Sequence, residues 1–159
     1  MKVLIVSDTH SVNENLYKVI EKESPMDMLI HLGDGEGVEN ELDKIITCPI
    51  HIVGGNNDFF SRLPKEKEFF IGGYHVFATH GHAYLVSLNE EHVKEEGKGR
   101  GADIVMYGHT HKPIIKEEKG FIILNPGSLS YPRQEGREPS YIIMDVTHGE
   151  KAKFEIKYL

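Results

Sequence analysis

MKVLIVSDTH, residues 1–10, joins an apolar β-branched run to a polar Asp-Thr-His ending. The run over residues 2–7 predicts a buried strand. Two patterns then alternate along the chain, with helical spacing over residues 13–24 and 37–47 and strand patterns over 27–32 and 49–53. Strand-helix-strand-helix-strand is typical of a parallel α/β layer.

The second half of the chain has short strands separated by turns. Gly72-Gly73 predicts a hairpin between residues 69–71 and 74–79. The remaining predicted elements are a polar helix over 89–97, a strand over 103–107, and strand pairs over 113–116 with 121–124 and over 140–146 with 153–158. We therefore expect a mostly antiparallel second half, and two mixed sheets packed face to face with helices outside, in a single domain over residues 1–159.

Composition excludes several classes of protein. The net charge of −7 argues against broad, sequence-independent binding to nucleic acid, which needs a basic surface. Cys48, the only cysteine, rules out a disulfide within the chain and thiolate metal sites, and is expected to be buried or half-buried. No apolar run is long enough to span a membrane, and the N-terminus lacks signal-peptide features, so a cytoplasmic location is expected.

Polar clusters follow five of the predicted strands. Because ligands bind outside the carboxyl ends of strands in α/β sheets, these loops should converge. Each cluster alone is weak, since Asp and Asn beside Gly usually form turns, but five together are hard to obtain by chance. The clusters are Asp8-Thr9-His10, Gly33-Asp34, Gly54-Gly55-Asn56-Asn57-Asp58, Thr79-His80-Gly81-His82 and Gly108-His109-Thr110-His111.

Carboxylate, imidazole and amide oxygen together suit Mn, Fe, Zn and similar ions. The side chains are too many for one closed tetrahedral site, whereas two ions sharing Asp34 would use them all. Two metal ions held roughly 3.5–4 Å apart are a common arrangement in enzymes that catalyse phosphoryl transfer. The remaining histidines are expected to pack in strands (His31 and His51) or to have no role (His75, His92 and His148).

The five clusters resemble those of the calcineurin-like metallophosphoesterase superfamily. The short chain, the two His-x-His loops and Asn125-Pro126-Gly127-Ser128 resemble its small YfcE-like phosphodiesterases. The resemblance covers essentially the whole chain and implies a four-layer α-β-β-α sandwich. It implies one metal held by Asp8, His10, Asp34 and His111, and a second held by Asp34, Asn56, His80 and His109. Asp34 would bridge them, Asp34, Asn56 and His109 would be catalytic, and residues 125–128 would buttress the site.

Asn57 departs from the superfamily pattern. Many phosphatases of the superfamily have a proton-donating His there, which the small phosphodiesterases also lack, often having Cys instead. An amide is no general acid, and losing acid catalysis typically costs on the order of 10²–10⁴-fold in rate. This favours esters with acidic leaving groups and disfavours serine/threonine protein phosphatase activity.

The sequence therefore predicts a phosphodiesterase that hydrolyses a small phosphoester by in-line attack of a metal-bridging hydroxide. Manganese is the expected metal, with Fe, Zn or Ni as alternatives. Asn57, His82 and Arg133 are the predicted substrate contacts, although His82 also suits a structural role and Arg133 a solvated one. The alternatives are a phosphomonoesterase, a nucleotide phosphatase or nuclease of the same superfamily, and a non-catalytic retromer-type scaffold. Homo-oligomerisation stays open.

Overall fold

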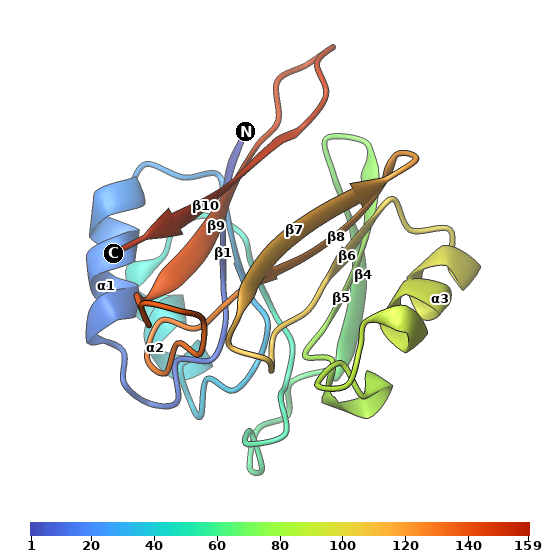
Figure 1. Cartoon of the computed structure of the whole chain (residues 1–159). Coiled ribbons are helices and arrows are strands. Elements are labelled where there is room, and N and C mark those ends of the chain that lie inside the picture. The colour runs from blue at the N-terminus through green and yellow to red at the C-terminus, as the bar shows by residue number, and fades with distance from the viewer.

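Two five-stranded sheets form the centre of the computed structural model, which describes all 159 residues (Figure 1). In the first sheet, β1 and β2 are parallel, as are β2 and β3, while β9 and β10 join antiparallel beside β1. The expected parallel layer is therefore present. The strands in sheet order are β10 (Lys153–Tyr158), β9 (Ser140–Asp145), β1 (Lys2–Val6), β2 (Met28–His31) and β3 (Ile50–Ile52).

The second sheet has more parallel pairing than the sequence predicted. β6 runs parallel to both of its neighbours, β5 and β8, and only the outer pairs are antiparallel hairpins. The segment between β5 and β6 contains helix α3 (Glu91–Gly99), which makes the parallel crossover. The strands in sheet order are β4 (Glu66–Ile71), β5 (Tyr74–Thr79), β6 (Ile104–Met106), β8 (Phe121–Pro126) and β7 (Pro113–Glu118).

Three apolar clusters hold four layers together. Seventeen buried residues fill the space between the sheets. Helices α1 (Glu14–Glu23) and α2 (Glu39–Ile45) cover the outer face of the first sheet, and α3 covers the second, so each outer cluster joins one sheet to its helices (Figure 1). The predicted α-β-β-α sandwich is confirmed. None of its helices is both long and apolar enough to cross a membrane.

Element ends differ from expectation where local chemistry intervenes. Helix α2 begins at Glu39 because Gly37 has a left-handed backbone, with φ of 99°. β4 begins three residues earlier than predicted, since Arg100 pairs with Glu66 and Glu68 at 2.7 and 2.8 Å and neutralises its charged start. His31 is fully buried, as expected of a core residue.

A buried carboxylate ties α1 to the first sheet. Glu23 accepts hydrogen bonds from Tyr141 Oη at 2.8 Å and Lys157 Nζ at 3.2 Å, and forms an ion pair with Lys2 Nζ at 2.7 Å. Burial alone would raise the pKa of Glu23, but these three partners lower it to about 2. The folded state therefore favours the charged form of Glu23 more than the unfolded chain does.

We predict that Glu23→Gln lowers the free energy of unfolding at pH 7 by about 1–3 kcal/mol, because the charged hydrogen bonds are lost. Since the folded pKa of Glu23 is depressed, its contribution is complete above about pH 4.5 and is lost as the pH falls towards 2. Urea unfolding of both proteins between pH 7 and pH 3 measures this. A difference that stays constant across that range would contradict it.

Candidate metal centre

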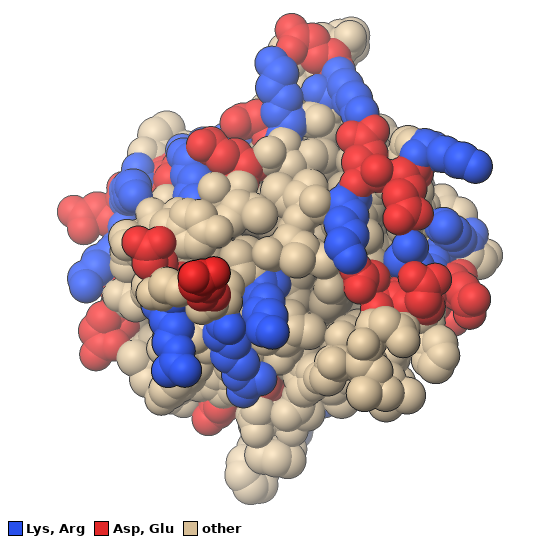
Figure 2. Space-filling view, viewed as in Figure 1, with Lys and Arg blue, Asp and Glu red and all other residues tan.

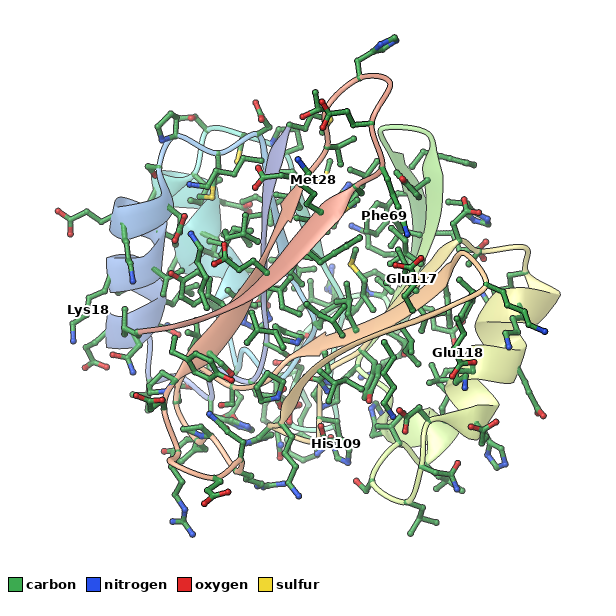
Figure 3. The ribbon with its side chains drawn as sticks, turned by 45° about the horizontal axis from the view of Figure 1, so that its top comes forward. Lys18, Met28, Phe69, His109, Glu117 and Glu118 are labelled. Atoms are coloured by element: carbon green, nitrogen blue, oxygen red, sulfur yellow. The ribbon has the colours of Figure 1, made fainter.

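Four of the five predicted loops are joined in two pairs by backbone hydrogen bonds. Asp8 N donates to Gly33 O at 3.0 Å, and His10 N donates to Asp34 O at 2.9 Å, which joins the loops after β1 and β2. Gly108 N donates to His80 O at 3.1 Å and joins the loops after β5 and β6. Figure 3 shows His109 at the lower edge of the two sheets. The strand ends therefore gather as the sequence predicted.

Carboxylates and imidazoles meet in two overlapping clusters. Asp8, His10 and His111 form one, and Asp8, Asp34 and His80 form the other, with the potential ligand atoms of each within 4.8 Å of one another. His111 Nε2 lies 3.0 Å from Asp8 Oδ1, and His80 Nε2 lies 3.4 Å from Asp34 Oδ2. Asp8 thus belongs to both clusters, whereas the sequence assigned the shared position to Asp34 alone.

Three of the histidines are turned so that Nε2 faces the clusters. His80 Nδ1 donates to the carbonyl of Leu32 at 2.7 Å, and His111 Nδ1 donates to that of Tyr131 at 2.6 Å. His10 Nδ1 lies 2.8 Å from the Glu36 carboxylate. Such partners on one ring nitrogen fix the tautomer that leaves the other nitrogen free to bind a metal.

Several buried atoms of the predicted metal ligands have no hydrogen-bond partner in the protein. They are Asp8 Oδ1, Asn56 Oδ1 and His80 Nε2. Buried polar atoms nearly always have a partner, so three such atoms among the predicted ligands require an explanation. All three are hard or borderline donors, which divalent cations bind well. The residues present therefore fit a divalent metal centre.

Electrostatics favours positive charge at the same place. Burial alone would raise the pKa of Asp34, but the imidazole of His80 and the amides of Asn57 hold it well below its usual value. Burial would lower the pKa of His80, but Asp34 and Asp8 raise it.

For His109, burial and the neighbouring His80 lower the pKa. Its ring centroid is 5.1 Å from that of His80, so His109 lies beside the second cluster.

The sequence profile of the calcineurin-like phosphoesterase superfamily domain matches residues 1–149. The chain belongs to this superfamily. The probable metallophosphoesterase YsnB of Bacillus subtilis is 32% identical over 145 residues, 91% of this chain and 83% of YsnB. Phosphodiesterase MJ0936 of Methanocaldococcus jannaschii is 30% identical over 147 residues, 80% of this chain and 83% of the relative.

Solved structures agree with this membership. A predicted phosphoesterase of Streptococcus pneumoniae superposes with a TM-score of 0.84 and 26% identity, over 99% of this chain and 88% of the other. Vps29 of Entamoeba histolytica, solved with Zn²⁺, has a TM-score of 0.78 at 22% identity over 99% of both chains, which is a likeness of fold alone. This phosphoesterase is a metal-dependent phosphoric ester hydrolase.

The phosphoesterase holds its cluster with strained backbone. Five of its site residues have the left-handed conformation that non-glycine residues avoid, at about 1–3 kcal/mol each. Their φ angles are 55° at Asp8, 46° at His10, 52° at Asp34, 67° at His109 and 58° at His111. The surrounding hydrogen bonds must compensate for this strain. The predicted buttress contributes, because Asn125 Nδ2 donates to Gly108 O and Ser128 Oγ donates to Asp8 O, each at 2.7 Å.

Sequence reasoning missed the role of Asp58. Its buried carboxylate accepts three backbone hydrogen bonds, from Asp34 N at 2.8 Å, Gly55 N at 2.7 Å and Glu36 N at 2.6 Å. It thereby joins the loop after β2 to the loop after β3. The only signal was its place in Gly-Asn-Asn-Asp, which by itself is typical of a turn.

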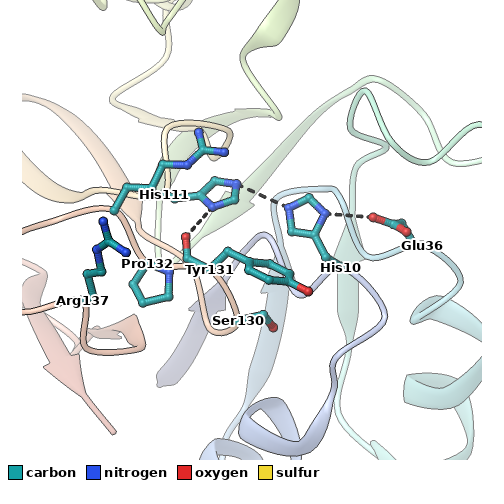
Figure 4. Close-up of a pocket in the computed structure, with 8 residues that line it drawn as sticks. His10, Glu36, His111, Ser130, Tyr131, Pro132 and Arg137 are labelled. Atoms are coloured by element: carbon teal, nitrogen blue, oxygen red, sulfur yellow. Dashed lines mark hydrogen bonds and ion pairs between the residues drawn. The ribbon is translucent and has the colours of Figure 1, made fainter.

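The predicted substrate contacts lie around the cluster. Asn57 donates to Asp34 from both its backbone N, at 2.8 Å, and its Nδ2, at 2.7 Å. His82 begins a short 3-10 helix, η1 (His82–Tyr84), and its ring centroid is 6.2 Å from that of His109. Arg133 lines a cleft of about 900 Å³. His10 and His111 line the same cleft (Figure 4).

We predict that Asp58→Asn weakens divalent metal binding by about 10- to 100-fold, because the amide has one acceptor oxygen where two are used. Stability should fall by about 1–3 kcal/mol, since a buried N–H loses its acceptor. Calorimetric titration of metal-free protein with Mn²⁺ and thermal unfolding measure the two effects. Asp43→Asn, an exposed change on α2, is the matched control. Wild-type metal affinity in Asp58→Asn would contradict the assignment.

Proposed function

We propose that this hydrolase is a phosphodiesterase that requires two divalent metal ions. The observation that carries the proposal is the pair of overlapping clusters, in which buried atoms of Asp8 and His80 have no hydrogen-bond partner; the buried Asn56 Oδ1 also has none. One ion is assigned to Asp8, His10, Asp34 and His111, and the other to Asp34, Asn56, His80 and His109. Asp8 belongs to both clusters, so its carboxylate would lie beside both ions.

Two divalent ions in these positions would lower the pKa of a shared water and neutralise charge on the phosphoryl oxygens. The protein orients the donors for them, through Leu32 O on His80 and Tyr131 O on His111. Asp34, Asn56 and His109 are assigned to the catalytic centre, and Asn57, His82 and Arg133 to substrate contacts. Manganese is the proposed metal, with Fe, Zn and Ni as alternatives.

Asn57 favours a diester over a monoester as substrate. Its amide donates to Asp34 and offers no group that can protonate a leaving oxygen. A relative at 30% identity, MJ0936, is itself named a phosphodiesterase, which supports the same choice. The acidic chain, with a net charge of −7, fits a small phosphoester better than a nucleic acid.

We predict that Mn²⁺-loaded protein hydrolyses bis(p-nitrophenyl) phosphate, and that His109→Ala and Asp34→Asn each reduce kcat/KM by at least about 10²-fold, since the first removes a metal donor and the second replaces an anionic carboxylate donor with a neutral amide. Release of p-nitrophenol measures this. His92→Ala and Asp43→Asn, both exposed and remote from the clusters, are the matched controls. Metal content of each variant is measured in parallel.

Full activity in metal-stripped protein, or in both variants, would overturn the proposal. Faster turnover of p-nitrophenyl phosphate than of the diester would indicate the monoesterase alternative. Two bound metals without turnover of either ester would favour a scaffold of the retromer type.

We also predict a steep dependence on the leaving group. Without a general acid, the departing oxygen must carry its own negative charge, so a phenyl ester should react about 10²–10⁴-fold more slowly than its p-nitrophenyl counterpart. The measurement is kcat for a series of aryl methyl phosphates with substituents of different acidity. A flat series would show that another group protonates the leaving oxygen.

A further inference from the structure

The segment between β8 and β9 is fastened to the metal centre. Ser130 Oγ donates to Thr9 O at 2.7 Å and to Val12 O at 2.9 Å, in the loop after β1. Arg133 N donates to His111 O at 3.0 Å, in the loop after β6. We call residues 130–138 the arginine turn, because it contains Arg133 and Arg137. Its position is therefore set by the same loops that supply the metal donors.

The arginine turn has internal structure of its own. Arg137 N donates to Gln134 O at 3.1 Å, and Gln134 Nε2 donates to Glu138 O at 2.5 Å. Gly136 and Arg137 have left-handed backbones, with φ of 83° and 49°. For a non-glycine residue such as Arg137 this conformation carries a cost. The backbone of the turn is therefore held in one conformation, which fixes the positions from which Arg133 and Arg137 extend.

Both arginines line the cleft beside the metal centre. Figure 4 shows Arg137 on the far side of His111 from His10. Neither guanidinium forms an ion pair or a hydrogen bond within the protein, whereas Arg100 pairs with three glutamates. Glu36, the one carboxylate that lines this cleft, is bound to His10. Two cations therefore face one cleft without an internal partner.

Arginine is scarce in this acidic chain, yet two arginines line the same cleft. There are 25 acidic and 18 basic residues, and only four of the basic residues are arginines. Two of those four line this one cleft. Glu135 and Glu138 belong to the same turn but do not line the cleft. Figure 2 shows Lys and Arg side chains gathered on the lower part of this face, below two acidic ones.

We infer that the cleft binds a second anionic group of the substrate, a phosphate or a carboxylate, beyond the phosphodiester at the metal centre. Guanidinium groups match both anions in shape and hydrogen bonding, and they stay charged at every physiological pH. The inference rests on the proposed phosphodiesterase activity and adds to it a substrate class. That class comprises phosphodiesters in which the alcohol retained on phosphorus carries a further negative charge.

The test uses Mn²⁺-loaded full-length protein and three p-nitrophenyl phosphodiesters that differ only in the second alcohol, which is ethyl, 2-phosphoethyl or 2-carboxyethyl. We expect KM to be about tenfold lower for at least one anionic ester than for the ethyl ester. Arg133→Gln and Arg137→Gln should each reduce that preference by about three- to tenfold. Lys18→Gln, which removes an equal charge on the outer helix α1, should preserve it (Figure 3).

The outcomes separate the two proposals. Hydrolysis of all three esters without any preference would overturn this inference and leave the phosphodiesterase standing. A preference that survives in both arginine variants would also overturn it, because the second anion would then bind the metals. A preference for the phosphate ester alone, or for both anionic esters, identifies the anion accepted. No hydrolysis of any ester would overturn both proposals. Circular dichroism and thermal unfolding of each variant confirm that it is folded.

Discussion

The buried charge of Asp8 is the constraint on which the site depends. Its carboxylate is fully buried, and burial alone would raise its pKa, but the imidazoles of His111 and His80 lower it. Asp8 Oδ2 also accepts a hydrogen bond from the backbone N of His109 at 3.0 Å. An isolated buried carboxylate would cost several kcal/mol, so the surrounding loops must supply opposite charge and donors. Asp8 thereby draws the two sheets' loops to a common point.

The two-sheet core lowers the entropic cost of bringing these loops together. The apolar layer between the sheets holds both sets of strand ends in place, so loops from different sheets meet without ordering long connections. Two glycines allow the loops to approach this closely. A Cβ at Gly55 would collide with the Asp34 carboxylate, and one at Gly108 would collide with Ser7 and Asp8. The left-handed backbones at the site residues are the strain that this rigid frame sustains.

The strand-end clusters were predictable because each combines a local apolar run with polar residues directly after it. What escaped prediction depends on pairs distant in sequence. The Asp58 carboxylate accepts hydrogen bonds from the backbone N–H groups of Asp34 and Glu36, which precede it by 24 and 22 positions. The Glu36 carboxylate contacts the ring of His10, which lies 26 positions earlier. The contact of the Asn57 amide with Asp34 was likewise not foreseen, and the prediction that Asn57 contacts substrate stays a prediction. No periodicity in the sequence encodes such partners, because each depends on how the loops meet in space.

Charge balance links the metal centre to the arginine turn. With the two proposed divalent ions bound, their charge would outweigh the carboxylates of Asp8 and Asp34, and the centre would be positive although the chain as a whole is negative. A phosphodiester carries a single negative charge and would leave part of that positive charge, and both guanidiniums of the turn, without a partner. A diester with a second anion would bring further negative charge to both. Glu36, the one carboxylate that lines the cleft, is held against His10 at 2.8 Å, and this contact offsets part of its repulsion of an anionic substrate.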